Sequence, residues 1–127
     1  MKNGITVGMD MGDKNHSVCV LDAEGKVVTR TTVANTGTAI RKYFGGLEAC
    51  RVAMEAGTHS GWVSRILEEL GHAVLVGNPR KLRVIWDSDE KNDERDAEML
   101  ARIARFDPHL LYPIHHRGQK SQTDLAV

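Results

Sequence analysis

Three strand-like runs at the start of the chain, followed by strands that alternate with helices, limit the folds open to this sequence. Residues 4–33 are rich in side chains that favour strands, and the segments GDKNH and DAEGK divide them into three runs. Turn segments this short join antiparallel strands. We therefore expect the chain to begin with an antiparallel meander.

The rest of the pattern alternates helices and strands. Short apolar runs in CRVAMEAG and AVLVGNP predict buried strands, and NTGTAIRKYFGGL, SGWVSRILEELGH and RKLRVIW predict helical segments. A long helix is expected from about Lys91 to Phe106, with an apolar side made of Met99, Leu100, Ile103, Ala104 and Phe106. The order β-β-β-α-β-α-β-α predicts an α/β fold with a mixed sheet and helices on both faces.

The balance of charges excludes a protein that is strongly basic over its whole length. The 127 residues carry 17 basic and 17 acidic side chains, so the formal net charge is zero and any nucleic-acid contact has to be local. Arg80, Lys81 and Arg83 form one such basic stretch, after a predicted strand and before the long helix. They are candidates for contact with a phosphodiester backbone, and a solvated face explains them equally well.

Cysteines, histidines and hydropathy indicate an intracellular protein without a metal site of the zinc type. Cys19 and Cys50 lie in apolar strand-like surroundings, which predicts buried free thiols. The six histidines lack metal-ligand spacing, which favours solvated or phosphate-contacting side chains. No apolar run reaches the roughly 18 residues of a membrane span, so we expect a cytoplasmic location without membrane contact.

Acidic residues end two of the predicted strands. Asp10 ends the first strand in VGMDMGDKN and Glu55 ends the fourth in VAMEAG, each near a glycine that allows a ligand to approach. If these strands are neighbours, both carboxylates project into one crevice. Asp13 is close in sequence but belongs to the turn, so it is left outside the predicted site.

A second pair of acids begins the long helix. Asp93 and Asp96 are three residues apart and share one helix face, which the helix would bring across the crevice. Simpler interpretations are a solvated helix start for this pair, a turn residue for Asp10 and a loop entry for Glu55. Four converging carboxylates would need counter-charge. Mg²⁺, or Mn²⁺ in its place, suits such oxygen ligands, and two ions about 3.5–4 Å apart can clamp a phosphodiester during displacement.

Three segments together resemble a known family. VGMDMGDKNHSVCVLDAEGKVV, MEAGTHSGWVSRILEELGHAVLVGNPRKLR and KNDERDAEMLARIA are similar to the N-terminal domain of the bacterial insertion-sequence DEDD transposases. The similarity covers nearly the whole chain. It is carried by the combination of a strand-ending Asp, a strand-ending Glu before a small residue, and a Lys-x-Asp-x-x-Asp-Ala helix start.

The resemblance implies a RuvC-like catalytic domain with an RNase H-like fold. Carried over residue by residue, its catalytic and metal-binding tetrad is Asp10, Glu55, Asp93 and Asp96. It implies Mg²⁺-dependent strand cleavage and exchange on DNA during transposition, with two ions once substrate is bound. It also implies a guide RNA encoded by the element and a homo-oligomeric full-length protein.

The resemblance also sets an expected domain division. Members of the family continue through a helical segment into a second domain that carries a nucleophilic serine. Residues 1–110 are therefore expected to form the catalytic domain and residues 111–127 the start of the connecting segment. No serine in this chain matches the nucleophile motif, so we expect the chain to bind metal weakly and not to recombine DNA by itself.

Other function classes share parts of the pattern. A RuvC-like structure-specific nuclease has the same acidic crevice and cleaves with water. An actin-like ATP-binding module resembles GMDMGDKN, but it leaves Asp93 and Asp96 unexplained. A non-catalytic assembly module also stays open, because residue identity alone does not show that four carboxylates meet.

Overall fold

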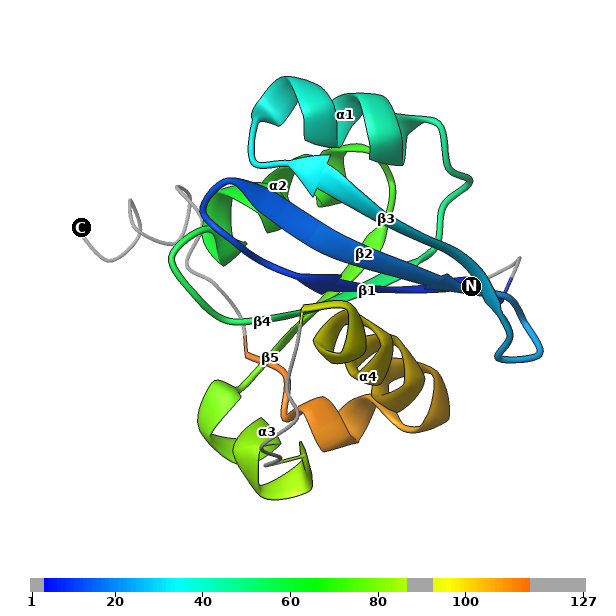
Figure 1. Cartoon of the computed structure of the whole chain (residues 1–127), viewed down its shortest axis with the longest axis vertical. Helices are drawn as coiled ribbons and strands as arrows, with labels where there is room; N and C mark the ends of the chain where they lie inside the picture. Colours follow the sequence, from blue (N-terminus) through cyan, green and yellow to red (C-terminus); the bar gives the residue numbers. More distant parts are fainter. Residues whose placement is uncertain (1–3, 87–92, 115–127) are drawn as a thin grey trace, which may run out of the picture.

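A five-stranded mixed sheet forms the centre of the domain (Figure 1). The computed structural model describes residues 4–86 and 93–114, and only the backbone of residues 83–86 and 93. The strands stand in the order β3-β2-β1-β4-β5. Their bounds are Thr6–Asp10 for β1, Asn15–Leu21 for β2, Val27–Ala34 for β3, Arg51–Glu55 for β4 and Ala73–Gly77 for β5. The first three strands are antiparallel and β4 runs parallel to both β1 and β5, which confirms the predicted meander and mixed sheet.

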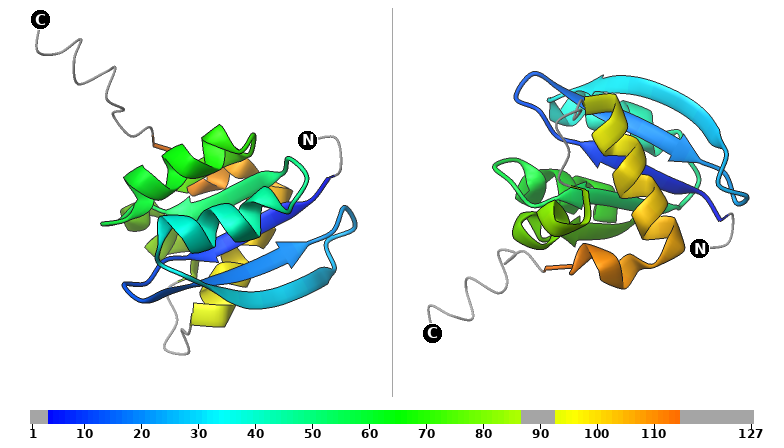
Figure 2. Two further views of the ribbon diagram at one scale, coloured as in Figure 1. Left: turned by 90° about the horizontal axis from the view of Figure 1, so that it is seen from above. Right: turned by 60° about the horizontal axis from the view of Figure 1, so that its bottom comes forward.

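Helices cover both faces of this sheet, as the sequence predicts (Figures 1 and 2). On one face lie α1 (Gly37–Gly45) and α2 (Ser60–Glu69). On the other lie α3 (Pro79–Trp86) and α4 (Asp93–Phe106), followed by the short 3₁₀ helix η1 (Pro108–Leu111). After η1 the chain reaches Ile114, which forms an antiparallel bridge with Val76 of β5.

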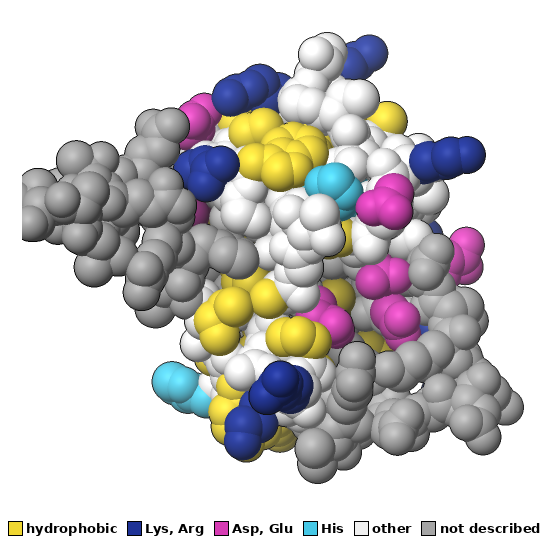
Figure 3. Space-filling model, turned by 90° about the vertical axis from the view of Figure 1, so that its left-hand side faces the viewer, with side chains coloured by type: hydrophobic (Ala, Val, Ile, Leu, Met, Phe, Trp, Pro, Cys, Tyr) yellow, Lys and Arg dark blue, Asp and Glu magenta, His cyan; other side chains and the backbone are white. Residues whose placement is uncertain are grey.

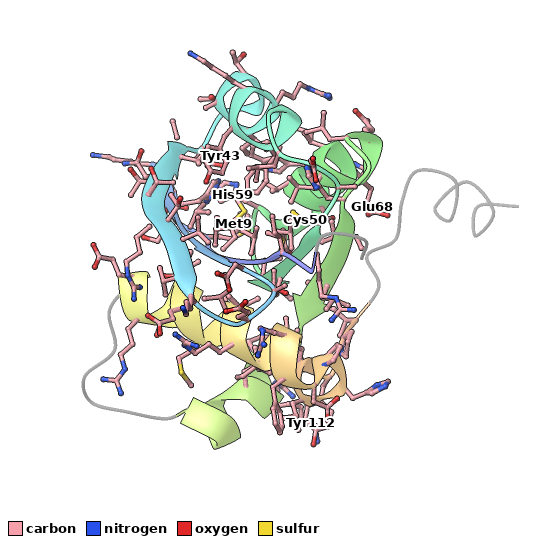
Figure 4. The ribbon with its side chains drawn as sticks, turned by 90° about the vertical axis from the view of Figure 1, so that its right-hand side faces the viewer. Met9, Tyr43, Cys50, His59, Glu68 and Tyr112 are labelled. Atoms are coloured by element: carbon pink, nitrogen blue, oxygen red, sulfur yellow. The ribbon has the colours of Figure 1, made fainter. Side chains whose placement is uncertain are left out.

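The layer between the sheet and α1 and α2 is the larger core. Alternate residues of β1 and β4 point into it, and they meet the apolar stripes of the two helices. Figure 4 labels Met9 and Cys50 in this layer, and neither is exposed to solvent. Both predicted free thiols, Cys19 and Cys50, are buried, and burial raises the pKa of the Cys50 thiol to about 11.

Two histidines, His16 and His72, lie in this core, which corrects for these two the expectation that the histidines are solvated or contact phosphate; His109 is exposed, as expected. His16 is fully buried and His72 is 4% exposed. In His72, Nδ1 accepts a hydrogen bond from the Cys50 amide at 3.2 Å and Nε2 lies 2.8 Å from the Phe44 carbonyl oxygen. A neutral imidazole has one donor and one acceptor, so satisfying both allows it to be buried. Sequence spacing carries no signal for such long-range partners.

Folding stability should fall in mild acid because His16 is buried as a neutral ring. Its Nδ1 accepts from the Gly12 amide at 3.2 Å, and Nε2 lies 2.9 Å from Oδ1 of Asn35. Burial lowers its pKa below the usual histidine value of 6.5, an effect that the Asn35 hydrogen bond partly offsets. The unfolded chain therefore takes up a proton as the pH drops through about 6.5 while the folded chain resists it. Neutral His16 contributes fully to folding stability above that pH. Below it, the free energy of unfolding falls by up to about 1.4 kcal/mol per pH unit.

Urea unfolding between about pH 5 and pH 8 measures this effect, with a His16→Gln variant as the comparison. Glutamine does not titrate. The slope of unfolding free energy against pH in this window should therefore be shallower in the variant, by up to the contribution of one proton, about 1.4 kcal/mol per pH unit. Equal slopes in the two proteins would show that His16 does not control the acid sensitivity.

Close packing of small residues holds α4 against the other face of the sheet. Gly8 of β1 lies so near the helix that a Cβ atom built on it would be 1.9 Å from the Ala97 carbonyl oxygen and 2.6 Å from the Ala101 amide nitrogen. Both alanines are buried beside Cys19 and Leu21 of β2. Figure 2 shows α4 crossing this face of the strands.

The expected apolar side of α4 is correct in part. Leu100, Ile103 and Ala104 are buried and Met99 is half-buried, but Phe106 is 82% exposed, so its predicted place on the apolar side of this helix is wrong. Residues two positions apart in a helix point to nearly opposite sides, since each residue turns the helix by about 100°. Burial of Ala104 therefore directs Phe106 away from the sheet.

Two contacts fix the direction in which α4 crosses the sheet. Arg51, at the start of β4, donates through Nη1 to the Ala104 carbonyl oxygen at 3.0 Å. Gly8, in the middle of β1, lies against Ala97 and Ala101, which come earlier in the helix. Moving toward the N-terminus of α4 therefore leads along β1 toward its carboxyl end. The first turn of α4 lies at the end of the sheet where β1 and β4 finish.

Candidate acidic site

Asp10 and Glu55 finish neighbouring parallel strands. β1 and β4 pair in register with Gly8 beside Ala53. Alternate residues of a strand point to the same side, and both Gly8 and Ala53 face α4. Asp10 and Glu55 come two residues later, so they project from the same face of the sheet. The condition set by the sequence, that the first and fourth strands are neighbours, is met.

The other two predicted acids belong to the first turn of α4. Asp93 is its first residue, and Asp96, three residues later, is half-buried. Because Asp96 directly precedes Ala97, it stands at the end of the sheet that carries Asp10 and Glu55. The side chain of Asp93 lies outside the described residues. Three of the four acids thus share one end and one face of the sheet, and the fourth is placed there by its backbone.

A pocket of about 230 Å³ opens at this end of the sheet. It is formed by the loop after β1 and the loop after β4, with Asp10 and Glu55 at its edge. Its lining consists of Asp10, Met11, Gly12, Asp13, Glu55, Ala56, Gly57, Thr58 and His59. Figure 3 looks onto this side of the molecule and shows acidic side chains gathered near a histidine.

A histidine and a carboxylate form part of the pocket wall. Nε2 of His59 is 3.2 Å from Oδ1 of Asp13, and its Nδ1 accepts a hydrogen bond from the Trp62 indole at 3.2 Å. An indole nitrogen can only donate, so the proton of a neutral His59 is on Nε2 and is directed toward Asp13. The loop after β1 is thereby joined to the start of α2. Asn35 supports the same loop by donating to the Asp13 carbonyl oxygen at 3.0 Å.

Sequence reasoning left Asp13 outside the site and gave His59 no particular role. The structure places both in the lining of the same pocket as Asp10 and Glu55. A signal was present, because Asp13 follows the first strand-ending acid by three residues and His59 follows the second by four. Loops that follow neighbouring parallel strands lie at the same edge of the sheet, and their polar residues can therefore meet.

The chemistry of the donors suits a hard divalent cation, but the described side chains do not already form a cage for one. Carboxylate oxygens such as those of Asp10, Glu55 and Asp96 are the ligands that Mg²⁺ prefers. Among the described residues, which exclude the Asp93 side chain, no group of three or more His, Cys, Asp or Glu is close enough to hold a metal. Mutual repulsion disfavours a tighter cluster without counter-charge. Metal binding would need these acids to move closer together or Asp93 to join them.

The predicted basic stretch lies on α3, away from the pocket lining. Arg80 and Lys81 are exposed, and the Nζ of Lys81 is 5.6 Å from the centre of the Tyr112 ring. Asn78 accepts hydrogen bonds from the amides of Arg80 and Lys81 at 3.0 and 3.4 Å, which starts the helix. The backbone of Arg83 continues α3, and its side chain lies outside the described residues.

Sheet order, helices on both faces and acids at the ends of β1 and β4 define a domain of the RNase H-like class. A family model described as a transposase, of the IS110-type DEDD class, matches residues 7–126. The chain therefore belongs to the DEDD transposase family. This membership confirms the family that the sequence motifs indicate, and it favours the transposase interpretation over the ATP-binding one.

A probable family 20 transposase of Pseudomonas aeruginosa is similar to this chain. The two are 32% identical over 115 residues, a match that covers 91% of this chain and 33% of that protein. The chain thus spans about a third of the length of this curated relative. Among residues 4–86 and 93–114, no helix is both long and apolar enough to cross a membrane.

Proposed function

We propose that this domain provides the acidic active site for divalent-metal-dependent DNA strand cleavage and exchange in the transposition of an insertion sequence. The observation that carries the proposal is the shared placement of Asp10, Glu55 and the first turn of α4. Two rigid strands and one helix, far apart in sequence, each bring acids to one end and one face of the sheet. Membership of a transposase family supports DNA as the partner and a divalent metal as the cofactor.

Asp10, Glu55, Asp93 and Asp96 are the proposed ligands and would together hold two Mg²⁺ or Mn²⁺ ions when substrate is bound. The chemistry that such ions supply is polarisation of the scissile phosphate and stabilisation of charge on the leaving 3′ oxygen. The acids are carried by strand ends and by a packed helix. Because these elements are rigid, the acids lose little freedom when a ligand binds. Arg80, Lys81 and Arg83 are the proposed contacts to the phosphodiester backbone, and binding through them should weaken as salt is raised.

Other parts of the proposal concern the complete transposase. Residues 1–110 would form the catalytic unit and residues 111–127 the beginning of a connecting helical segment. A serine outside this chain would attack the DNA, a structured RNA would guide the choice of target, and the protein would act as a homo-oligomer in the cytoplasm. A branched DNA cut by this chain with water alone would instead favour a structure-specific nuclease of the same fold.

The first test is thermal unfolding of this chain with and without about 10 mM Mg²⁺ or Mn²⁺. A ligand with Kd near 1 mM that binds only the folded state adds about 1.4 kcal/mol at that concentration, which raises Tm by about 3–6 °C. In a variant that combines Asp10→Asn and Asp93→Asn this rise should disappear. The same variant should be more stable than the parent without metal, because repulsion among the acids is relieved.

A Glu24→Gln variant is the matched control. Glu24 is an exposed acid in the turn between β2 and β3, at the other end of the sheet. The variant removes one negative charge without touching the site, so the metal-induced rise in Tm should be the same as in the parent. An equal metal response in the parent and the double variant would mean that the ions bind elsewhere.

A further inference from the structure

A second pocket, of about 400 Å³, lies at the opposite end of the sheet from the acidic site. It is formed where β1 and β4 begin and α4 ends. Thr6 opens β1 there, and Arg51, Arg105 and Phe106 are among the residues that line it. Four residue steps along β1 separate Thr6 from Asp10, which is about 13 Å in a strand. The two pockets are therefore distinct.

Two guanidinium groups line this pocket without an acidic partner. Arg51 donates through Nη1 to the Ala104 carbonyl oxygen, and Arg105 through Nη2 to the Ala23 carbonyl oxygen, each at 3.0 Å. Within the described part of the chain, no carboxylate lies within 4.0 Å of either group. Each guanidinium has five N–H donors, so each is anchored by one and keeps others for a ligand.

Other arginines of the domain show what a purely structural arrangement looks like. Arg30 and Arg102 both form ion pairs with Glu98, and Arg41 pairs with Glu69. Each of these three cations contacts a carboxylate, on another element for Arg30 and Arg41 and within α4 for Arg102. Arg51 and Arg105 instead hold positive charge at a polar pocket, where an anion with two or more oxygens could bridge them.

Phe106 adds a flat apolar surface beside these cations. It is the most exposed of the large hydrophobic residues in the described segments, at 82%. A single exposed apolar side chain is ordinary on a protein surface. Its position next to Arg105 at the pocket is the informative part, because aromatic rings beside basic grooves are the platforms on which unpaired bases stack.

We propose that this pocket binds a single-stranded nucleic-acid segment, with a phosphate between Arg51 and Arg105 and an adjacent base stacked on Phe106. The choice of nucleic acid among phosphate-bearing ligands rests on the proposed function. A paired duplex keeps its bases stacked inside, so the Phe106 contact favours an unpaired strand. The segment would lie beyond the strand end that carries the acids, and the pocket would hold the strand without contacting the scissile phosphate.

Fluorescence anisotropy tests the proposal with a labelled oligonucleotide of about 12 nucleotides, as single-stranded DNA, as single-stranded RNA and as duplex DNA. The measurement uses EDTA-containing buffer at about 50 and 200 mM salt. Phe106→Leu keeps an apolar side chain but removes the ring, and it should weaken single-strand binding by about 5- to 100-fold. Arg105→Gln should weaken it as well and should reduce the slope of log affinity against log salt by about 0.7.

Matched controls separate this site from general surface effects. Arg41→Gln removes a cation that is paired with Glu69 on the helical face, and Val28→Ser removes another exposed apolar side chain. Both should leave strand binding within about twofold, and all four variants should unfold near the parent temperature. Unchanged binding in Phe106→Leu, or an equal loss in Arg41→Gln, would overturn the proposal.

Two further arms identify the ligand. Millimolar inorganic phosphate or a mononucleotide should compete far more weakly than unlabelled strand; equal competition would show a simple anion site and overturn the strand-binding proposal. The preference between DNA and RNA strands identifies the natural source of the segment, and stronger binding of duplex would contradict the stacking contact. Because strand binding is measured in EDTA, it does not depend on the proposed metal site, so failure of that site can be told apart from failure of this pocket.

Discussion

An Asp10→Asn substitution is expected to reduce strand cleavage by at least about 100-fold in an active transposase that carries this sequence. Asparagine keeps the size of the side chain and removes its charge, so the fold should persist while the proposed metal site would lose a carboxylate. Metal-bound charge stabilisation contributes several kcal/mol to phosphoryl displacement, and 2.7 kcal/mol corresponds to 100-fold in rate. The measurement is the single-turnover rate of cleavage of a labelled DNA carrying the element's end, in Mg²⁺.

Asp13→Asn provides the control inside the same pocket. Asp13 lies in the pocket lining and its Oδ1 is 3.2 Å from His59, but its side chain is 94% exposed and it is outside the proposed ligand set. Its cleavage rate should stay within about fivefold of the parent, because a surface contact of this kind is worth at most about 1 kcal/mol. If Asp13→Asn and Asp10→Asn were equally inactive, the ligand set would have to be redrawn around Asp13.

Much of the fold could be predicted because its local signals agree. The turn segments GDKNH and DAEGK set the meander, and the alternation of apolar runs with amphipathic helices set the rest of the order. Thr36 caps α1, because its Oγ1 accepts a hydrogen bond from the Ala39 amide at 3.1 Å. Such features depend on residues close in sequence, which is why periodicity and capping rules reach them.

The candidate site was only partly predictable, because its remaining features depend on contacts between distant elements. Asp10 and Glu55 could be paired by assuming that β1 and β4 are neighbours. Nothing local indicates that His59 approaches Asp13 or that His16 is buried beside Asn35, since these contacts span 19 to 46 residues. The outward position of Phe106 likewise follows from which face of α4 the sheet selects.

Gly8→Ala is expected to destabilise the domain by roughly 3 kcal/mol or more, although it adds a single methyl group. The added Cβ would lie 1.9 Å from the Ala97 carbonyl oxygen and 2.6 Å from the Ala101 amide nitrogen, and these backbone atoms cannot rotate away. Either α4 moves off the sheet or β1 distorts, and overpacking of this kind costs about 1–3 kcal/mol even where side chains can adjust. Urea unfolding followed by circular dichroism measures the loss of stability.

Gly61→Ala is the matched control, and it should change stability in the opposite direction. Gly61 lies in α2 with only the end of the Arg65 side chain near its added Cβ, at 4.0 Å, and alanine is favoured over glycine in helices by up to about 1 kcal/mol. If Gly8→Ala still folds, its metal-induced rise in Tm should also be lost, since α4 sets the position of Asp93 and Asp96 relative to Asp10. Full stability together with a full metal response in Gly8→Ala would show that close packing of α4 on β1 does not position these acids.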